Sequence, residues 1–400
     1  MEQLPQIDPI AGAIARLVDR LSCVGVESCM TERAGGRVLA EVLLADRDSP
    51  AIDVSAVDGY AIRLLDLRSE RLPVVTVVAA GSAPSSLSAG EAVRIFTGAA
   101  VPPEADCVIR REETIELSDQ VKITAPVDSL HAGQNIRRRG ENTKAGDVVL
   151  SRGTVLNAPA MGAIATFAPV QLMVQRRVRV VVLNTGDELA GIGAHVKPWQ
   201  IRDSNGPLLE SWLRQLPWID FVCRKHVGDT LESVQSAIAA HLPLADAILL
   251  TGGVSMGDTD FVPEAVVRLG GEVAFHRLPI RPGRPVLGAS LDGKLLLGLP
   301  GNPVSVAVTS RVIGLPMLRK LAGIVPTEES LMRCELTNPD DNSLSLIWYR
   351  LVKIGPDSQV RLIGSQGSVD LVSLALSDGF VEIPMGARGS GPWRVRWWRD

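Results

Sequence analysis

The chain has 400 residues, of which 46% are hydrophobic and 22% charged, and its formal net charge is −4. This length predicts two to four domains with buried cores, and the mildly acidic balance disfavours non-specific binding to nucleic acid. The five cysteines contain no CxxC pair, no signal peptide begins the chain and no apolar run could span a bilayer. We therefore expect a reduced, cytoplasmic protein that does not bind membranes.

The first 176 residues predict two modules. Residues 1–50 and 143–176 are assigned to an elongated connecting and dimerisation domain, whose N-terminal helix could pack on the α/β domain described below. A second helix is predicted over residues 31–45. Residues 51–142 contain short apolar runs broken by Gly, Pro and Ser, which is typical of a small β-rich domain.

Residues 177–326 alternate between apolar runs and helical patterns, which predicts a doubly wound, mostly parallel α/β domain covered on both faces. The predicted strands are 178–184, 221–227, 245–253 and 294–300, and the predicted helices are 204–216, 229–242, 260–271 and 302–323. Residues 327–400 again read as short strands, so we predict a C-terminal β-barrel-like domain. The fold class is therefore multidomain, α/β plus β.

Polar, glycine-bearing segments follow three of the predicted parallel strands, namely 184–188, 251–253 and 300–302. Ligands bind at the carboxyl ends of strands in such sheets, so these segments are expected to meet at one edge. Asp187 and Glu188 could hold Mg²⁺ there, because hard cations prefer carboxylate oxygens, or could orient a water. The alternative is a solvated turn, which the position at the end of a parallel strand disfavours.

Asp229 and Asp260 each precede a predicted helix, so both could be N-caps, and both could also face the ligand edge. The ligand interpretation is favoured for Asp260, which follows the glycine loop, and is even for Asp229.

Basic and hydroxyl side chains suggest anion sites. Arg281 and Arg284 flank a Pro-Gly turn that would fix a guanidinium pair suited to an oxyanion, whereas Arg277 fits an ordinary surface position. Asn302-Pro303 opens a helix whose N-terminus could bind an anion, with Ser305 in its first turn. The arginine cluster at 137–139 is either a solvated loop or a contact for a phosphate or pterin group.

The chain resembles the molybdopterin molybdenumtransferase family, the MoeA and gephyrin E-domain class, over nearly its whole length. The matching motifs are SAVDGYA (55–61), IFTGAAVP (95–102), GQNIRRRGEN (133–142), NTGDEL (184–189), TGGVSMGDTDF (251–261), RPGRP (281–285), GLPGNPVS (298–305) and QGS (366–368). The resemblance implies a homodimer whose central domain is MogA-like, similar to molybdopterin adenylyltransferases. It also implies the reaction, in which molybdate is inserted into adenylylated molybdopterin and AMP is released. Mg²⁺ is the implied cofactor of this reaction.

The resemblance also implies roles for individual residues. Catalytic residues would be Asp58, Glu188, Asp229 and Asp260, with Glu188 and Asp260 as metal ligands. Substrate-binding residues would be Thr97, Arg137, Thr185, Gly186, Asp187, Gly252, Gly253, Ser255, Pro300, Gly301 and Asn302. The molybdate pocket would contain Arg281, Arg284, Ser305, Arg350 and Ser368. The family usually has Asp at Asn142 and Lys at Arg277, Arg281 and Arg284.

Two other functions compete with the transferase. An adenylyltransferase acting on molybdopterin would use the same α/β domain, but would leave residues 51–142 and 331–400 unexplained. A non-catalytic scaffold or specialised paralogue of the family would release no AMP. The molybdopterin adenylyltransferase itself is a possible partner.

Overall fold

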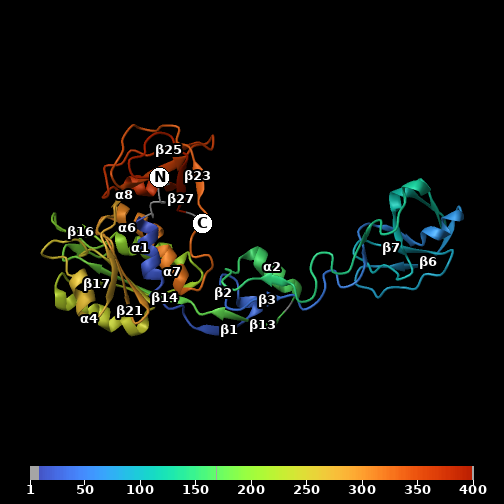
Figure 1. The fold of residues 1–400 in the computed structure, drawn as a ribbon, viewed down its shortest axis with the longest axis horizontal. Coiled ribbons are helices and arrows are strands. Elements are labelled where there is room, and N and C mark those ends of the chain that lie inside the picture. Colours follow the sequence, from blue (N-terminus) through green and yellow to red (C-terminus); the bar gives the residue numbers. More distant parts are fainter. Residues whose placement is uncertain (1–8, 168, 399–400) are drawn as a thin grey trace, which may run out of the picture. The chain divides into compact units, whose positions relative to one another are not determined.

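The computed structural model describes residues 9–167 and 169–398, and the chain divides into two compact units (Figure 1). Unit 1 consists of Met1–Glu41, Arg152–Met161 and Val170–Asp400, and unit 2 consists of Val42–Ser151 and Gly162–Pro169. No helix among the described residues has both the length and the apolar character needed to cross a bilayer.

The central sheet of unit 1 confirms the predicted doubly wound, mostly parallel arrangement. Its strand order is β17-β14-β18-β22-β21-β19, and the first four strands run parallel. These strands are β14 (Val178–Thr185), β17 (Ile219–Val227), β18 (Ala247–Thr251) and β22 (Lys294–Leu299), followed by the antiparallel β21 (Leu287–Leu291) and β19 (Glu272–His276). Residues of β14, β18 and β22 are almost all buried, as expected for strands covered on both faces.

Alternate residues of each central strand belong to different cores. Val180 and Val182 of β14 pack with α3 (Asn205–Arg214) and with the helical segment after β22, whereas Val181 and Leu183 pack with α4 (Leu231–His241) and α5 (Val262–Arg268). This period of two is the geometry of a strand between two helical layers. The N-terminal helix α1 (Pro9–Val18) joins the first core through Ala13 and Leu17.

Two helix predictions need correction. The predicted helix over residues 302–323 is interrupted: α6 (Pro303–Thr309) passes into a π-helical turn (Ser310–Gly314) and then into α7 (Leu315–Leu321).

The helix predicted over residues 31–45 is wrong, because this segment forms a 3₁₀ turn (Thr31–Arg33) and the short strands β2 (Val38–Leu39) and β3 (Leu43–Leu44). Gly36 breaks it with φ +76°, and a Cβ there would lie 2.4 Å from the Pro217 Cβ.

A second sheet in unit 1 is formed mainly by the C-terminal residues. Its order is β20-β24-β26-β27-β23, with β25 beside β24. The strands are β20 (Ile280–Arg281), β23 (Met332–Cys334), β24 (Ile347–Ile354), β25 (Val360–Leu362), β26 (Gly379–Ile383) and β27 (Trp393–Trp397), accompanied by α8 (Leu371–Leu376). β20 pairs with β24 and ends at Arg281, so the Arg-Pro-Gly-Arg segment connects this sheet along the chain to β21 of the central sheet.

The smaller strands of unit 1 form two further sheets. β1 (Val26–Met30), β13 (Gln171–Gln175) and β2 form an antiparallel sheet, and β15 (Leu189–Ala190) pairs with β16 (Ile201–Arg202). The helix α2 (Ala158–Phe167) precedes β13 in the chain.

Unit 2 contains a six-stranded sheet of order β8-β5-β7-β6-β10-β9. These strands are β5 (Gly59–Ile62), β6 (Leu72–Val78), β7 (Ala92–Ile95), β8 (Cys107–Arg110), β9 (Thr114–Glu116) and β10 (Gln120–Ile123). Two short pairs complete the unit, β4 (Val54–Ser55) with β11 (Ile136–Arg137) and β3 with β12 (Val148–Leu150).

Candidate functional site

The carboxyl ends of three adjacent parallel strands meet at one edge of the central sheet, as the sequence predicted. Asn184 of β14 is in register with Thr251 of β18, which is in register with Leu299 of β22. The segments that follow are close enough that a Cβ added to Gly301 would lie 3.8 Å from the Gly252 Cα. The three glycine-bearing segments therefore form one continuous surface.

Glycine is required where these segments touch. Gly252 and Gly253 have φ values of +82° and +62°, and a Cβ on Gly252 would lie 2.8 Å from both the carbonyl oxygen and the hydroxyl oxygen of Thr185. The Thr185 hydroxyl donates to the Thr251 carbonyl oxygen at 3.3 Å. Backbone is consequently exposed to a ligand at this edge without an intervening side chain.

Asp187 and Asp229, two of the predicted carboxylates, each accept a hydrogen bond from the backbone N–H of the other. The Asp187 N–H donates to Asp229 Oδ2 at 3.0 Å, and the Asp229 N–H donates to Asp187 Oδ1 at 3.2 Å. His226 Nε2 is 2.7 Å from the Gly186 carbonyl oxygen. Asp229 is not an N-cap, because Thr230 caps α4 by accepting a hydrogen bond from the Ser233 N–H at 3.1 Å. Asp187 and Asp229 therefore fix the shape of the strand-end loops.

Asp260 is not an N-cap either, since Phe261 occupies that position of α5. Its Oδ2 accepts a hydrogen bond from the Gly257 N–H at 2.7 Å and so closes the loop after the glycine pair. Glu188 is exposed at the end of the neighbouring loop. Among the described residues, no three His, Cys, Asp or Glu side chains cluster as a ready-made metal site.

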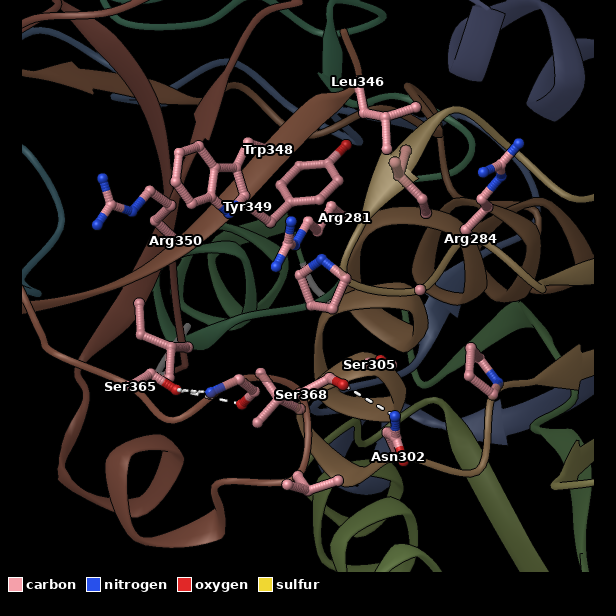
Figure 2. Close-up of a pocket in the computed structure, with 18 of the residues that line it drawn as sticks. Arg281, Arg284, Asn302, Ser305, Leu346, Trp348, Tyr349, Arg350, Ser365 and Ser368 are labelled. Atoms are coloured by element: carbon pink, nitrogen blue, oxygen red, sulfur yellow. Dashed lines mark hydrogen bonds between the residues drawn. The ribbon is translucent and has the colours of Figure 1, made fainter. Parts of the chain in front are cut away.

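One pocket of about 950 Å³ contains the five residues predicted around the oxyanion, Arg281, Arg284, Ser305, Arg350 and Ser368 (Figure 2). It also contains four residues predicted from the strand-end loops, Ser255, Pro300, Gly301 and Asn302. The structure therefore brings the guanidinium pair and the end of β22 into one cavity.

The turn between the two pocket arginines is fixed by packing. Gly283 has φ +101°, and a Cβ there would lie 2.3 Å from the Thr309 Cγ2 of α6. Arg281 pairs with Trp348 across β20 and β24. Within the described part of the chain, neither Arg281 nor Arg284 has a carboxylate within 4.0 Å. Arg277 is exposed and does not line the pocket.

The third pocket arginine is different, because Arg350 has partners of its own. Its Nη1 donates to Asp340 Oδ2 at 2.5 Å, and its Cζ lies 4.3 Å from the centre of the Trp348 ring. Burial would raise the pKa of Asp340, but the bond from Arg350 and the Asn342 N–H outweigh it, and the pKa is lowered. Arg350 is therefore already charge-compensated.

The hydroxyl groups of Ser305 and Ser368 lie across the pocket from Arg281 (Figure 2). Ser305 is buried in the first turn of α6, and the Ser368 hydroxyl accepts a hydrogen bond from Asn302 Nδ2 at 2.8 Å. Asn302 occupies the predicted N-cap position of α6, but its side chain makes no capping bond. Its amide instead connects the end of β22 to the C-terminal segment.

In unit 2, motifs distant in sequence meet at Asp58. Asp58 Oδ1 accepts hydrogen bonds from the N–H and the hydroxyl of Thr97, both at 2.8 Å. The Thr97 N–H is the largest cause of a lowered Asp58 pKa, followed by its hydroxyl, with smaller contributions from Arg111 and Arg94. Arg94 and Arg111 were missed in the sequence, because only the fold places them beside Asp58.

The arginine cluster of unit 2 is paired with acceptors. Arg137 Nη2 donates to Asn142 Oδ1 at 2.5 Å, so the amide oxygen stands where the family usually has a carboxylate. The other two arginines pair with aspartates, Arg138 with Asp53 and Arg139 with Asp48, each at 2.5 Å. The solvated-loop alternative gains support for Arg138 and Arg139.

Trp348, which lines the pocket, and Asp340, which binds the pocket residue Arg350, were also missed. A signal for Trp348 was present, since it precedes Arg350 by two positions and alternate residues of a strand share a face. Asp340 lies in the polar loop 338–343, where nothing in the sequence distinguishes it from Asp341.

The site agrees with comparisons to known proteins. Residues 9–168 match the family "MoeA N-terminal region (domain I and II)", and residues 181–320 match "Probable molybdopterin binding domain". A molybdopterin molybdenumtransferase of Staphylococcus aureus strain COL is 31% identical over 95% of this chain and 92% of its own length. The relative of the same description from Staphylococcus epidermidis ATCC 35984 is 31% identical over 88% of this chain and 86% of its own length.

Solved structures agree as well. Two crystal structures of the molybdopterin biosynthesis MoeA protein from Pyrococcus horikoshii have TM-scores of 0.77 and 0.82, at 27% and 26% identity. They cover 99% and 98% of this chain and 100% of their own chains. These matches include the β-rich flanks that an adenylyltransferase would leave unexplained. The chain belongs to the molybdopterin molybdenumtransferase (MoeA) family, transferase enzymes of molybdenum cofactor biosynthesis.

Proposed function

We propose that this enzyme inserts molybdate into adenylylated molybdopterin and releases AMP in a Mg²⁺-dependent step. The observation that carries the proposal is the pocket lined by Arg281 and Arg284, which have no carboxylate within 4.0 Å among the described residues, and by buried and half-buried serine hydroxyls beside the end of β22. Guanidinium groups and hydroxyls are suited to a tetrahedral oxyanion.

The pocket matches the charge of molybdate. Arg281 and Arg284 have no carboxylate partner among the described residues and so supply two uncompensated positive charges, and molybdate is a dianion. Ser305 and Ser368 add hydroxyl donors from other directions, so a tetrahedral anion can be surrounded. The third cation, Arg350, would be recruited from its contact with Asp340. Together these arginines and serines would bind the incoming oxyanion and hold it near the substrate's dithiolene sulfurs.

The carboxylates suit a metal shared with the substrate. Mg²⁺ is usually held by one or two carboxylates together with substrate phosphates and water. The absence of a three-carboxylate cage among the described residues agrees with that mode. Glu188 and Asp260 would be its ligands, and the bound ion would neutralise charge on the phosphates. Asp187 and Asp229 would keep the strand-end loops in position.

The open backbone at Gly252, Gly253 and Gly301 leaves room for the phosphoanhydride of the adenylylated substrate. Thr185, Gly186, Ser255, Pro300 and Asn302 would complete this binding surface. The unit 2 residues Asp58, Thr97 and Arg137 are further proposed substrate contacts, on the strength of the family resemblance. We also propose a cytoplasmic homodimer that receives its substrate from a molybdopterin adenylyltransferase.

The test is the insertion rate as a function of molybdate concentration. Arg284→Ala should raise the half-saturating molybdate concentration by roughly tenfold to a hundredfold, because charge-assisted bonds contribute about 1.5–3 kcal/mol each. Arg284→Lys should have a smaller effect. Arg277→Ala is the matched control, since this arginine lies outside the pocket, and it should leave half-saturation unchanged.

The proposal fails if Arg284→Ala leaves the molybdate requirement unmoved. Weaker binding of adenylylated molybdopterin in that variant, with an unchanged molybdate requirement, would show that the arginines hold phosphate instead. Tungstate should be measured in parallel, because arginines replace the family's usual lysines at these positions.

A further inference from the structure

The Arg350 guanidinium contacts two side chains, Asp340 and Trp348. One nitrogen donates to Asp340 Oδ2, and the flat face of the group covers the Trp348 ring. A cation over an indole is attracted by the negative face of the ring. Arg281 and Arg284, in the same pocket, have neither an aromatic platform nor a carboxylate within 4.0 Å among the described residues.

These partners hold the guanidinium away from the rest of the pocket. Figure 2 shows the Arg350 guanidinium on the far side of the Trp348 ring from Arg281. Trp348 and Arg350 are alternate residues of β24, so both project from the same face. The indole thus stands between this cation and Arg281.

Asp340 is itself fixed by its own loop. Its Oδ1 accepts a hydrogen bond from the Asn342 N–H at 3.1 Å, which leaves Oδ2 for Arg350. The side chains of Arg350 and Asp340 are 19% and 35% exposed, so the pair is partly shielded from water but can separate without crossing a packed core. Among the described residues, no carboxylate lines the pocket, and Asp340 is the carboxylate within 4.0 Å of the Arg350 guanidinium.

We infer that Asp340 is a built-in competitor of the oxyanion for Arg350, and that it thereby sets the molybdate concentration the enzyme needs. The carboxylate holds the guanidinium behind Trp348 and adds negative charge beside a pocket that receives a dianion. Molybdate must draw Arg350 from Asp340 to gain its third cation. This inference rests on the proposed role of Arg350 as an oxyanion ligand.

The test is Asp340→Asn, which keeps the acceptor for the Asn342 N–H and removes the charge. The half-saturating molybdate concentration should fall by roughly three- to tenfold, since a partly exposed ion pair changes affinity by about one decade at most. Asp341→Asn is the matched control, because it removes the same charge from the next, exposed position. Half-saturation in that variant should stay within about twofold of wild type.

Arg350→Ala separates this inference from the proposed function. That variant should need more molybdate than wild type, and adding Asp340→Asn to it should lower the requirement less than the same change does in wild type, because the competed cation is gone and only the carboxylate's charge is removed. Equilibrium binding of molybdate to the folded enzyme by calorimetry should show the same order of affinities without turnover.

The outcomes are distinct. If Arg350→Ala leaves the molybdate requirement unchanged, Arg350 is not an oxyanion ligand and that part of the proposed function fails. If Arg350→Ala weakens molybdate binding but Asp340→Asn weakens it too, Asp340 instead positions Arg350 for binding and the competitor inference alone is overturned. Equal effects of Asp340→Asn and Asp341→Asn would likewise overturn it, since the cause would then be general charge.

Discussion

Arginine side chains of this chain differ in function according to the carboxylates beside them. Arg281 and Arg284 face the pocket without a carboxylate partner among the described residues, whereas Arg350 is paired with Asp340. The sequence could indicate the Arg281–Arg284 pair, because a short Pro-Gly turn links them. It could not indicate that Arg350 is held by a loop residue ten positions away, because only the β-sheet fold sets that distance.

Asp246 is a buried carboxylate that accepts several hydrogen bonds from arginine residues. It accepts two from Arg176, at 2.6 and 2.7 Å, and one from the Arg179 N–H at 2.8 Å. Burial would raise the pKa of Asp246, but the bonds from Arg176 and the Arg179 N–H outweigh it, so the pKa lies below its ordinary value. The charged form is therefore favoured by folding.

Asp246→Ala should lower the free energy of unfolding at neutral pH by about 2 kcal/mol, because a buried acceptor of several charge-assisted bonds is lost. Because the folded pKa is depressed, the contribution of Asp246 is present above its unfolded pKa and is lost as pH falls through its folded pKa. Wild type and variant should therefore converge in acid.

Urea unfolding across a pH series measures this difference. Asp357→Ala is the control, because Asp357 forms an exposed ion pair with Arg361 at 3.2 Å and should contribute little at any pH. A gap between wild type and Asp246→Ala that widens in acid would contradict the assignment.

At the scale of elements, the strand ends were predictable and the connections between sheets were not. Continuous apolar runs bounded by glycines predicted β14, β18 and β22, and a parallel sheet brings their ends together for topological reasons. Nothing in residues 280–281 indicated pairing with β24, because that contact depends on residues more than sixty positions later. The helix predicted over residues 31–45 is an element that the local pattern indicated but the structure does not contain, since helical periodicity there is overridden by Gly36.

Gly283 packs the pocket turn against α6. Gly283→Ala should lower the free energy of unfolding by about 1–3 kcal/mol. The added Cβ would be 2.3 Å from the Thr309 Cγ2, and the backbone has φ +101°. The molybdate requirement should rise as well, because the turn positions Arg281 and Arg284. Thermal unfolding and the insertion assay measure the two effects.

Gly364→Ala is the control for this change, since it adds the same methyl at the pocket with nothing within 4 Å. Thr309→Ser removes the clashing methyl and should recover part of the lost stability in the double variant. A Gly283→Ala variant as stable as Gly364→Ala would show that the turn tolerates a side chain.

At the scale of the whole molecule, proposed functional residues occur in both units. Unit 1 contains the carboxylate edge and the oxyanion pocket, and unit 2 contains the Asp58–Thr97 pair and the paired arginine loop. The family resemblance covers both units, which is why motifs spread over the whole chain could be recognised in the sequence. Partners such as Asp53 for Arg138 could not be recognised, because they come from other segments of the same unit.

The most direct test of the central claim is a single-turnover experiment with the full-length wild-type enzyme. Enzyme, adenylylated molybdopterin, molybdate and Mg²⁺ are mixed, and AMP and molybdenum cofactor are measured together over time. We predict that AMP and molybdenum cofactor form in equal amounts and that neither product accumulates when Mg²⁺ is chelated. Failure to form cofactor from intact substrate, or cofactor formation without AMP, would contradict it.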